Sequence, residues 1–404
     1  MLTKTELDKY ADVLLWGLKT ARTGKFKKED VILVQFDLPA VQLAEILQGK
    51  LLDMGMNPVI RSSLTPKMEH TFYQKANNRQ LVFRGSWQDD LYAHLSGRIY
   101  LHAPASLTHL ADIDPKRIGT HAVAMKPLRD TMREREEKGM LGWTLCMVPT
   151  EALAQKAGLS LRQYTNQVIK ACYLDKPDPV GEWKRLFKEA TTIKKWMNRM
   201  DVDYYHVESE GIDLKIKPGK KRQWIGVSGH NIPSFELFIS PDWRGTEGSY
   251  MADQPSFRSG NLVEGVRLTF KRGIVTEASA KKGEAFTRKQ LKMDKGASRV
   301  GEFSLTDKRF SKINKFMAST LYDENHGGRY GNCHLAVGAS YSDTYDGDPA
   351  ELTQEMKDQL GFNDSALHWD LVNTNKKTVT AHLASGESIV VYENGMFCCW
   401  ELRN

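Results

Sequence analysis

The sequence predicts an α/β fold in two parts: a first half with a mostly parallel sheet covered by helices, and a second half rich in strands. Three observations lead to this prediction. Short apolar runs alternate with helical patterns through the first half, the 404 residues suffice for two ordinary domains, and the pattern changes near residue 202. We therefore expect a Rossmann-like N-terminal α/β domain over residues 1–202 and a C-terminal α+β domain over residues 203–404.

The first elements carry clear start and stop signals. Thr3 and Glu6 have the spacing of a capping box, and the apolar residues after them recur at helical intervals, so we expect an opening helix. The apolar run at residues 31–36 predicts a buried strand. Residues 39–53 return to helical spacing and are followed by Gly55, a residue type that ends helices in the left-handed conformation.

Four further runs predict short strands in the same half, at residues 58–61, 81–84, 98–102 and 142–149. Strands that alternate with helices favour a parallel sheet, a fold that often binds nucleotides. The loop after the first strand reads DLPAV, however, and lacks the glycines that let a backbone approach a pyrophosphate. The sequence therefore argues against a nucleotide site.

Two helical segments close the first half. The mixed charge run at residues 129–138 is typical of the solvated face of a helix. Asp178 is placed to cap a long helix that has Pro179 at its first position and ends near Met200.

The second half reads as strands joined by turns. Residues 266–270 alternate apolar and polar side chains, and Lys271–Arg272–Gly273 turns the chain into a partner strand at residues 274–280. Basic residues recur at 215–222 around Pro218–Gly219, which indicates solvated lysines at a turn rather than a polyanion site.

Composition limits the partners and the compartment. The 57 basic and 50 acidic residues leave a net charge of +7, which gives little support to a nucleic-acid partner. No apolar run approaches the roughly 20 residues of a membrane helix, so we expect no membrane association. The first residues place acids and lysines where a signal peptide has its apolar core. With five cysteines, an odd number outside any zinc-ribbon spacing, we expect reduced thiols and a cytoplasmic protein.

Acidic and histidine side chains in the second half form the strongest chemical signal. Five of them stand in or beside apolar, strand-like segments: Glu236, Glu302, His334, His368 and Asp370. The sixth, Glu324, stands at the end of a helix expected from about Ser311. Taken singly, each is typical of a surface ion pair or a packed side chain. Several carboxylates in apolar segments are costly to bury unless something neutralises them, so a shared cation is a reasonable explanation. His368 and Asp370 lie two residues apart, on one face of a strand, and are placed to reach the same ion.

Other hydrolase designs are missing from the sequence. It contains no HExxH helix and no G-x-S-x-G elbow, and Cys333 directly precedes His334, whereas a nucleophile and its base seldom stand at adjacent positions. A carboxylate-rich, histidine-assisted metal site is therefore the best enzyme hypothesis.

Five motifs in one order resemble the aminopeptidase T/aminopeptidase S family of two-metal, thermophilic-type aminopeptidases. They read NIPSFELF, SRVGEFSL, YDEN, CHLAVGASY and ALHWDLV, and the resemblance extends over nearly the whole chain. It implies that Glu236, Glu302, Glu324, His334, His368 and Asp370 bind two divalent metal ions (Zn, Co or Mn). It also implies that Tyr341 is an active-site tyrosine.

The resemblance further implies a homodimer that hydrolyses the N-terminal residue from peptides with a free N-terminus, by water that two metal ions activate. In that mechanism Tyr341 donates a hydrogen bond to the oxyanion. Glu302 is a candidate general base as well as a candidate ligand, and the sequence does not separate these roles. Two alternatives stay open: another metal-dependent hydrolase, such as a dipeptidase or deacylase, and a catalytically disabled metal-binding homologue.

One departure from the family pattern lies between YDEN and CHLA. The segment HGGRYGN at residues 326–332 stands where the family has a very short link. It is expected to add His326, Arg329 and Tyr330 beside the site and to change the reach of Glu324 relative to His334.

Overall fold

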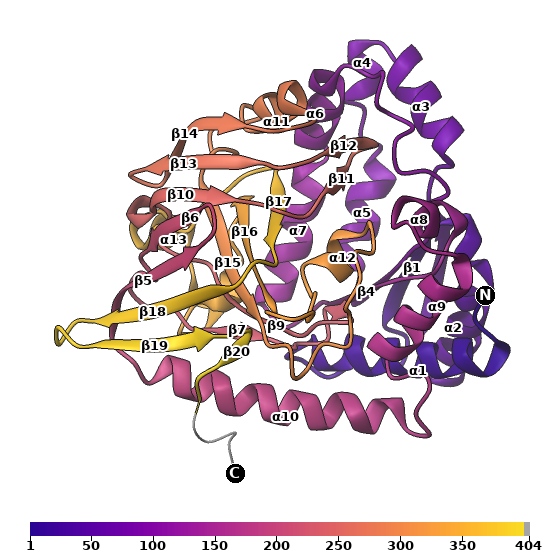
Figure 1. Cartoon of the computed structure of the whole chain (residues 1–404). Coiled ribbons are helices and arrows are strands. Elements are labelled where there is room, and N and C mark those ends of the chain that lie inside the picture. Colours follow the sequence, from indigo (N-terminus) through magenta and orange to yellow (C-terminus); the bar gives the residue numbers. More distant parts are fainter. Residues whose placement is uncertain (400–404) are drawn as a thin grey trace.

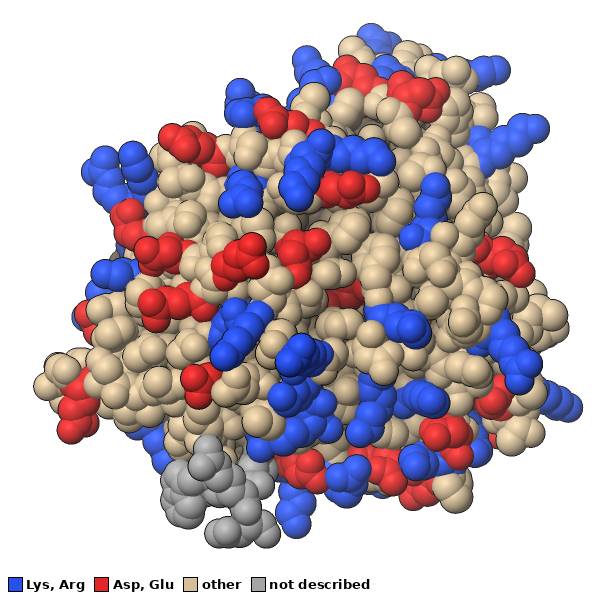
Figure 2. Space-filling model, viewed as in Figure 1, with Lys and Arg blue, Asp and Glu red and all other residues tan. Residues whose placement is uncertain are grey.

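The chain folds into a parallel α/β half and an antiparallel β half that lie side by side. The structure is a computed structural model and describes residues 1–399. Figure 1 shows the first half, in indigo to magenta, against the second, in orange to yellow, with one long helix running beneath both. Among the described residues, no helix has the length and apolar character that crossing a membrane requires. Acidic and basic side chains are interspersed over the face drawn in Figure 2, so the net charge is not gathered there.

The parallel sheet has five strands in the order β2-β1-β3-β4-β8, with every neighbouring pair parallel. These strands are β1 (Val31–Phe36), β2 (Asn57–Ser62), β3 (Gly97–His102), β4 (Gly142–Met147) and β8 (Asn231–Ile232). The mixed α/β architecture with a parallel first sheet is thus confirmed. Because β8 comes from beyond residue 202, the sheet continues past the predicted domain boundary, and that boundary stays a prediction.

Helices surround this sheet and lead to the second half. The opening helix has the predicted capping box, in which the Thr3 hydroxyl accepts from the Glu6 N–H and the Glu6 carboxylate accepts from the Thr3 N–H. The helices that begin in this half are α1 (Lys4–Thr20), α2 (Val41–Asp53), α3 (Pro66–Lys75), α4 (Asn78–Leu81), α5 (Ser86–His94), α6 (Pro115–Ala124), α7 (Lys126–Glu137), α8 (Glu151–Lys156), α9 (Leu161–Ala171) and α10 (Pro179–Asn198). A short 3-10 helix, η1 (Leu38–Ala40), precedes α2. As predicted, Asp178 caps α10 through the Gly181 N–H.

The strand predicted at residues 81–84 is wrong. Asn77 and Gln80 form a capping box that starts the one-turn helix α4, and the chain then stays irregular up to Gly85. Side-chain caps satisfy the backbone N–H groups locally and so compete with strand pairing. The apolar character of the segment is also not used in a sheet, since Phe83 is 70% exposed.

The charge run at residues 129–138 is helical as predicted, in α7, but its face is only partly solvated. Arg129, Glu134 and Lys138 are exposed, whereas Glu136 and Glu137 are partly buried. The carboxylate of Glu136 accepts from the Trp143 indole at 3.0 Å, and that of Glu137 accepts from Lys357 at 2.6 Å. One side of α7 therefore faces the protein.

The second half contains two antiparallel sheets and a small hairpin. The eight-stranded sheet, in the order β14-β13-β10-β6-β5-β18-β19-β20, comprises β5 (Val202–Ser209), β6 (Ile212–Ile216), β10 (Glu247–Met251), β13 (Arg267–Lys271), β14 (Ile274–Ser279), β18 (Lys377–Leu383), β19 (Ser388–Glu393) and β20 (Met396–Phe397). The five-stranded sheet, in the order β17-β16-β15-β9-β7, comprises β7 (Ile225–Gly226), β9 (Glu236–Ile239), β15 (Val300–Thr306), β16 (Asn332–Gly338) and β17 (His368–Asn373). The hairpin is β11 (Ser256–Arg258) with β12 (Asn261–Val263).

Hydrogen bonds tie the two larger sheets together. The Tyr250 hydroxyl of β10 donates to the carbonyl of Leu371 on β17 at 2.6 Å.

The predicted hairpin around Lys271–Arg272–Gly273 is confirmed, with β13 pairing to β14. The remaining short elements are α11 (Glu284–Gln290), α12 (Thr320–Asp323), α13 (Gln354–Leu360) and the 3-10 turns η2 (Trp243–Gly245), η3 (Ser342–Thr344) and η4 (Pro349–Glu351).

The helix expected from about Ser311 to Glu324 is also wrong. Only α12 is helical, and residues 311–318 are irregular. The carboxylate of Asp323 accepts from the N–H groups of Met317 and Ser319 at 2.7 and 2.9 Å. These backbone donors are satisfied by a side chain, so a longer helix is not needed to pair them.

Candidate metal centre

Four adjacent strands place acidic and histidine side chains on one face of the five-stranded sheet. In the order β17-β16-β15-β9, the register sets Asp370 opposite Ala336, His368 opposite Gly338, His334 opposite Ser304, and Thr306 opposite Glu236. Side chains at alternate positions share a face, so these acids and imidazoles converge. The neighbouring positions on that face hold small residues, Ser304, Ala336 and Gly338, which leave room between the strands.

The convergence brings ligand atoms to close distances. His334 Nε2 lies 2.9 Å from Glu302 Oε1, 3.3 Å from Glu236 Oε2 and 3.8 Å from Asp370 Oδ1. Glu236, Glu302 and His334 are all buried and offer atoms within 4.8 Å of one another, a spacing that suits one cation. The arrangement therefore joins residues almost 100 positions apart in the sequence.

His368 and Asp370 complete this face from β17, as the two-residue spacing predicts. His368 Nε2 lies 3.1 Å from Asp370 Oδ1 and 3.7 Å from Glu302 Oε2, while its Nδ1 lies 2.9 Å from the carbonyl oxygen of Ala339. A carbonyl acceptor holds the Nδ1 proton and leaves Nε2 for the cluster, which is a common support for metal-binding histidines. The two oxygens of Glu302 thus each approach a different imidazole.

Glu324 reaches the same pocket from the end of α12, although it lies on no strand. It lines the pocket together with the other five predicted residues, and Asn231 Nδ2 donates to its Oε1 at 3.3 Å. The loop that carries it is fixed by Asn325, whose side chain accepts from the Phe235 N–H at 2.6 Å. All six predicted ligand residues therefore line one pocket.

The segment HGGRYGN does not lie beside the cluster as expected. His326, Arg329 and Tyr330 are absent from the residues that line the pocket within the described chain. The segment closes on itself through the Gly331 N–H and the Gly327 carbonyl, and the Arg329 carbonyl accepts from Lys308 at 3.3 Å. The carbonyl of Tyr330 in this segment accepts from the hydroxyl of Tyr392 on β19 at 3.4 Å.

Burial and mutual repulsion raise the pKa values of two acids of the cluster, Glu236 and Glu324. Burial raises the pKa of Glu236 to about 7, with the charge of Glu302 adding to the rise and His334 opposing it. The pKa of Glu324 is raised well above its usual range by burial and by the charges of Glu236 and Asp370. Burial also opposes ionisation of Asp370, but His368 outweighs it and holds the pKa of Asp370 below its usual range.

The neighbouring carboxylates raise the pKa values of both histidines. Burial lowers the pKa of His334, but the hydrogen bond to Glu302 and the nearby charges outweigh it and raise that pKa to about 9. The same balance, with Asp370 as the main partner, raises the pKa of His368 to about 9. The pocket thus holds four carboxylates and two imidazoles. Even with both imidazoles protonated, four ionised carboxylates would exceed the positive charge by two. Buried His334 Nδ1, moreover, has no hydrogen-bond partner among the described residues. This donor set fits divalent cations.

Sequence reasoning missed the residues that support the cluster. The Ser304 hydroxyl donates to Glu236 Oε2 at 3.1 Å, and Arg258 Nη1 donates to the His368 carbonyl at 2.8 Å. Ser304 was readable from the sequence, because it stands two positions after Glu302 and therefore shares its face of the strand. The contact of Arg258 could not be predicted from the sequence, because Arg258 comes from the separate β11–β12 hairpin.

Tyr341 follows β16 and stands at the edge of the cluster. Its ring lies 4.9 Å from the ring of His368, and its N–H donates to Ser240 Oγ at 2.8 Å. Burial and the charge of Glu302 raise the pKa of the phenol well above its usual range, so the hydroxyl stays protonated and able to donate. A protonated phenol beside an anionic cluster suits hydrogen bonding to an oxygen that gains charge.

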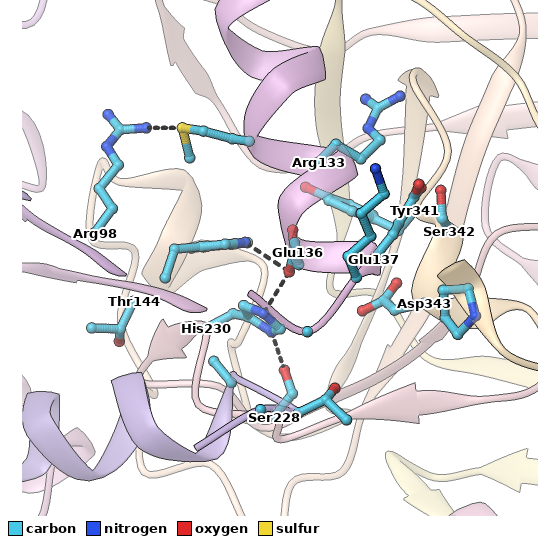
Figure 3. A pocket seen from close by; sticks show the side chains of 18 of the residues that line it. Arg98, Arg133, Glu136, Glu137, Thr144, Ser228, His230, Tyr341, Ser342 and Asp343 are labelled. Atoms are coloured by element: carbon cyan, nitrogen blue, oxygen red, sulfur yellow. Dashed lines mark hydrogen bonds and ion pairs between the residues drawn. The ribbon is translucent and has the colours of Figure 1, made fainter. Parts of the chain in front are cut away.

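The pocket of the cluster opens into a larger cavity. The inner pocket has a volume of about 70 Å³ and the outer cavity about 830 Å³. Both are lined by Glu136, Trp143, Ser228, His230, Tyr341 and Asp343, which form their junction. Figure 3 shows His230 between Glu136 of α7 and Ser228, with Asp343 nearby.

An ion pair and a hydrogen bond hold His230 at this junction. Its Nε2 lies 2.9 Å from Glu136 Oε1, and its Nδ1 lies 2.7 Å from Ser228 Oγ. Burial lowers the pKa of His230, but Glu136 outweighs it and raises that pKa. Asp343 stands apart: its Oδ1 is buried without a hydrogen-bond partner among the described residues, and burial raises its pKa to about 7.

Known proteins resemble this chain over most of its length. The family described as thermophilic metalloprotease (M29) matches residues 3–397. Aminopeptidase PepS of Streptococcus thermophilus is 24% identical over 97% of this chain and 98% of its own length. Aminopeptidase 2 of Geobacillus stearothermophilus is 27% identical over 91% of both chains, and aminopeptidase T of Thermus aquaticus is 27% identical over 71% of this chain and 72% of its own. The solved structure of wild-type AmpT from Thermus thermophilus, 21% identical, matches with a TM-score of 0.78 over 98% of this chain and 99% of its own, which shows a shared fold.

Proposed function

The chain belongs to the thermophilic metalloprotease (M29) family, and we propose that it is a metal-dependent aminopeptidase that removes the N-terminal residue from peptides. Membership confirms the resemblance inferred from the five sequence motifs. The aminopeptidase names of the relatives support the activity. The observation that carries the proposal is the buried carboxylate–imidazole cluster at the closed end of a cavity large enough for a peptide.

We propose that this cluster holds two divalent metal ions (Zn, Co or Mn). Their ligands would be the six side chains that line the inner pocket: Glu236, Glu302, Glu324, His334, His368 and Asp370. Two such cations supply Lewis-acid activation of water and of the scissile carbonyl. In support, Glu302 approaches one imidazole with each of its oxygens, a position suited to a ligand shared between two ions.

The chain's own groups orient the substrate around this pocket. The Tyr341 hydroxyl would donate a hydrogen bond to the carbonyl oxygen as that oxygen gains charge. The inner pocket, of about 70 Å³, opens through the junction residues into the outer cavity of about 830 Å³. This arrangement supports a substrate that presents one end to the cluster.

A role for Glu302 as general base is a separate part of the proposal. Glu302→Gln distinguishes it from the ligand role, since a lost ligand lowers the bound metal whereas a lost base lowers the rate with the metal retained. Metal content and kcat measured on the same sample separate the two.

The activity test uses a leucine anilide with a free amine and its N-acetylated counterpart. We expect hydrolysis of the free-amine substrate alone, loss of hydrolysis with a chelator, and recovery with Zn²⁺, Co²⁺ or Mn²⁺. Turnover that persists after the metal has been removed would contradict the proposal. Faster cleavage of the N-acetylated compound would instead indicate a deacylase.

We also propose a homodimer that works in the cytoplasm on peptides. The apolar side chains of Phe83 and Trp87, 70% and 54% exposed, lie near one another in sequence on the first half and suit a protein contact. Light scattering during size-exclusion chromatography tests the dimer, and a monomer at micromolar concentration would contradict it.

A further inference from the structure

The outer cavity lies between the parallel sheet and α7. Alternate positions of two strands, Arg98 and Tyr100 on β3 and Trp143 on β4, line one wall. The opposite wall includes Arg133 and Glu136, which share one face of α7. Helix α7, for which a solvated face was expected, thus supplies part of the cavity wall (Figure 3).

Several charges along this cavity are neutralised within the protein. Glu136 pairs with His230 at 2.9 Å and Glu137 with Lys357 at 2.6 Å. Arg133 lies 3.5 Å from Asp364. These pairs leave little net charge on that part of the wall, so any ligand preference depends on the groups that remain unpaired.

Arg98 is such a group, because every partner of its guanidinium is neutral. Nη2 donates to Gln35 Oε1 at 2.9 Å, and Nη1 lies 3.9 Å from the Met132 sulfur. Nε is buried without a hydrogen-bond partner, and no carboxylate lies within salt-bridge distance among the described residues. Nη1 and Nη2 each keep a second N–H, and a guanidinium held in place in this way is suited to bind a carboxylate with two parallel hydrogen bonds.

The charged groups without an ion pair are unevenly distributed along the cavity. Asp343, with its unpartnered buried oxygen, lies at the junction with the metal-ligand pocket, whereas Arg98, Arg129 and Asp348 lie on the outer cavity only. In Figure 3, Arg98 stands on the far side of the cavity from Asp343. The outer cavity thus carries two guanidinium groups and one carboxylate without an ion pair, a net positive charge that suits the carboxylate end of a peptide that enters with its amino group first.

We propose that the outer cavity binds the remainder of a short peptide substrate and that Arg98 binds its C-terminal carboxylate. The inference rests on the proposed function, because it takes the inner pocket as the place where the first residue is removed. Short peptides with a free carboxylate are then the preferred substrate class, and longer or C-terminally amidated peptides are poorer ones. Arg98 is a specificity-determining residue, distant from the bond that is cleaved.

The test compares peptides that differ only at the C-terminus. Di-, tri- and tetrapeptides with N-terminal leucine are supplied as free acids and as amides to the metal-loaded protein. We expect kcat/KM to favour the acid by at least about tenfold at one length, because a charge-assisted bidentate pair contributes that much and the wall is fixed. In Arg98→Gln the preference should fall to near one, because kcat/KM for the acid falls toward that for the amide.

Equilibrium binding separates this inference from the proposed function. The same acid and amide pair, with the first peptide bond reduced to a non-hydrolysable methylene-amine, is titrated into the protein by calorimetry. The acid should bind about tenfold more tightly to the wild type, and this difference should vanish in Arg98→Gln but persist in part in Arg98→Lys. Arg185→Gln, on the exposed side of α10, is the control and should keep the full preference.

Equal binding of acid and amide at every length overturns the inference even if the peptides are cleaved. An equal loss for acid and amide in Arg98→Gln also overturns it, because that result indicates a structural role. Acid-selective binding without hydrolysis supports the Arg98 site and contradicts the aminopeptidase proposal.

Discussion

His368 and Asp370 are proposed ligands that share one face of β17, and their side chains lie 3.1 Å apart. His368→Ala or Asp370→Ala removes a donor from the cluster, and we expect metal affinity to fall by about 100-fold or more, beyond the 10–100-fold typical of supporting residues. Metal titration by calorimetry measures the change. His382→Ala, on β18 outside the pocket, is the matched control and should bind metal as the wild type does. Unchanged affinity in both cluster variants would contradict the ligand assignment.

Tyr341 is expected to act on rate more than on binding. Tyr341→Phe removes the hydroxyl but keeps the ring that lies 4.9 Å from His368, so the cluster should keep its shape. We expect kcat to fall by roughly 100-fold, the effect of losing one donor to an oxyanion, with KM changed little. Steady-state kinetics test this expectation, and equal kcat values would reduce Tyr341 to a packing residue.

Protons should compete with metal for the cluster. The raised pKa values, about 7 for Glu236 and about 9 for His334 and His368, mean that these ligands carry protons near neutral pH in the metal-free protein. A ligand must lose its proton to bind a cation, so metal affinity should rise as the pH increases from 6 to 9. Calorimetry in buffers of different ionisation enthalpy counts the protons released. Affinity that stays flat over this range would contradict the shifts.

At the scale of elements, α10 and the segment before β9 meet at a buried aromatic stack. Trp183 is 1% exposed and stacks at 5.9 Å on Trp16 of α1 and at 5.5 Å on Phe235. Trp183→Ala leaves a cavity, and we expect the free energy of unfolding to fall by about 3–5 kcal/mol. Leu52→Ala, at a 56% exposed position of α2, should change it by less than about 0.5 kcal/mol. Denaturant unfolding distinguishes these values, and similar effects of the two variants would contradict the packing argument.

The elements with local signals were predictable from the sequence. The capping box at Thr3 and the apolar run at Val31–Phe36 were found with their correct types, because period and cap chemistry are local properties. The helix expected from Ser311 was predicted wrongly, because the Asp323 carboxylate accepts hydrogen bonds from backbone N–H groups of that segment. Strand β8 was not predicted, because its two residues are too few to show a periodic pattern. They form a strand through their pairing with β4.

The candidate site, too, was predictable only where the sequence carried a signal for its residues. The HWD triplet on β17 indicated that His368 and Asp370 share a face. Their place in or beside apolar segments drew attention to Glu236, Glu302, Glu324 and His334, and the family resemblance gave all six a common role as proposed metal ligands. The junction residues Glu136, His230 and Asp343 gave no signal, because they come from distant segments that only the tertiary fold brings together.

At the scale of the whole molecule, metal binding should stabilise the fold. The proposed ligands come from four strands and a loop that spans α12, and cations that bind the native state alone raise its stability by mass action. At a free metal concentration of 100 times Kd, each site adds about 2.7 kcal/mol. Chelation should therefore lower Tm, Zn²⁺ should restore it, and Asp370→Ala should shrink the shift. Calorimetric scans test this expectation, and an equal Tm with and without chelator would contradict it.

The central claim is that six side chains from the second half hold two cations in one pocket. Anomalous diffraction from crystals of the Zn²⁺-loaded protein tests it most directly. The account predicts two anomalous peaks about 3.5–4 Å apart, both enclosed by Glu236, Glu302, Glu324, His334, His368 and Asp370. Peaks elsewhere in the molecule, or a loaded protein with no peak in this pocket, would contradict it.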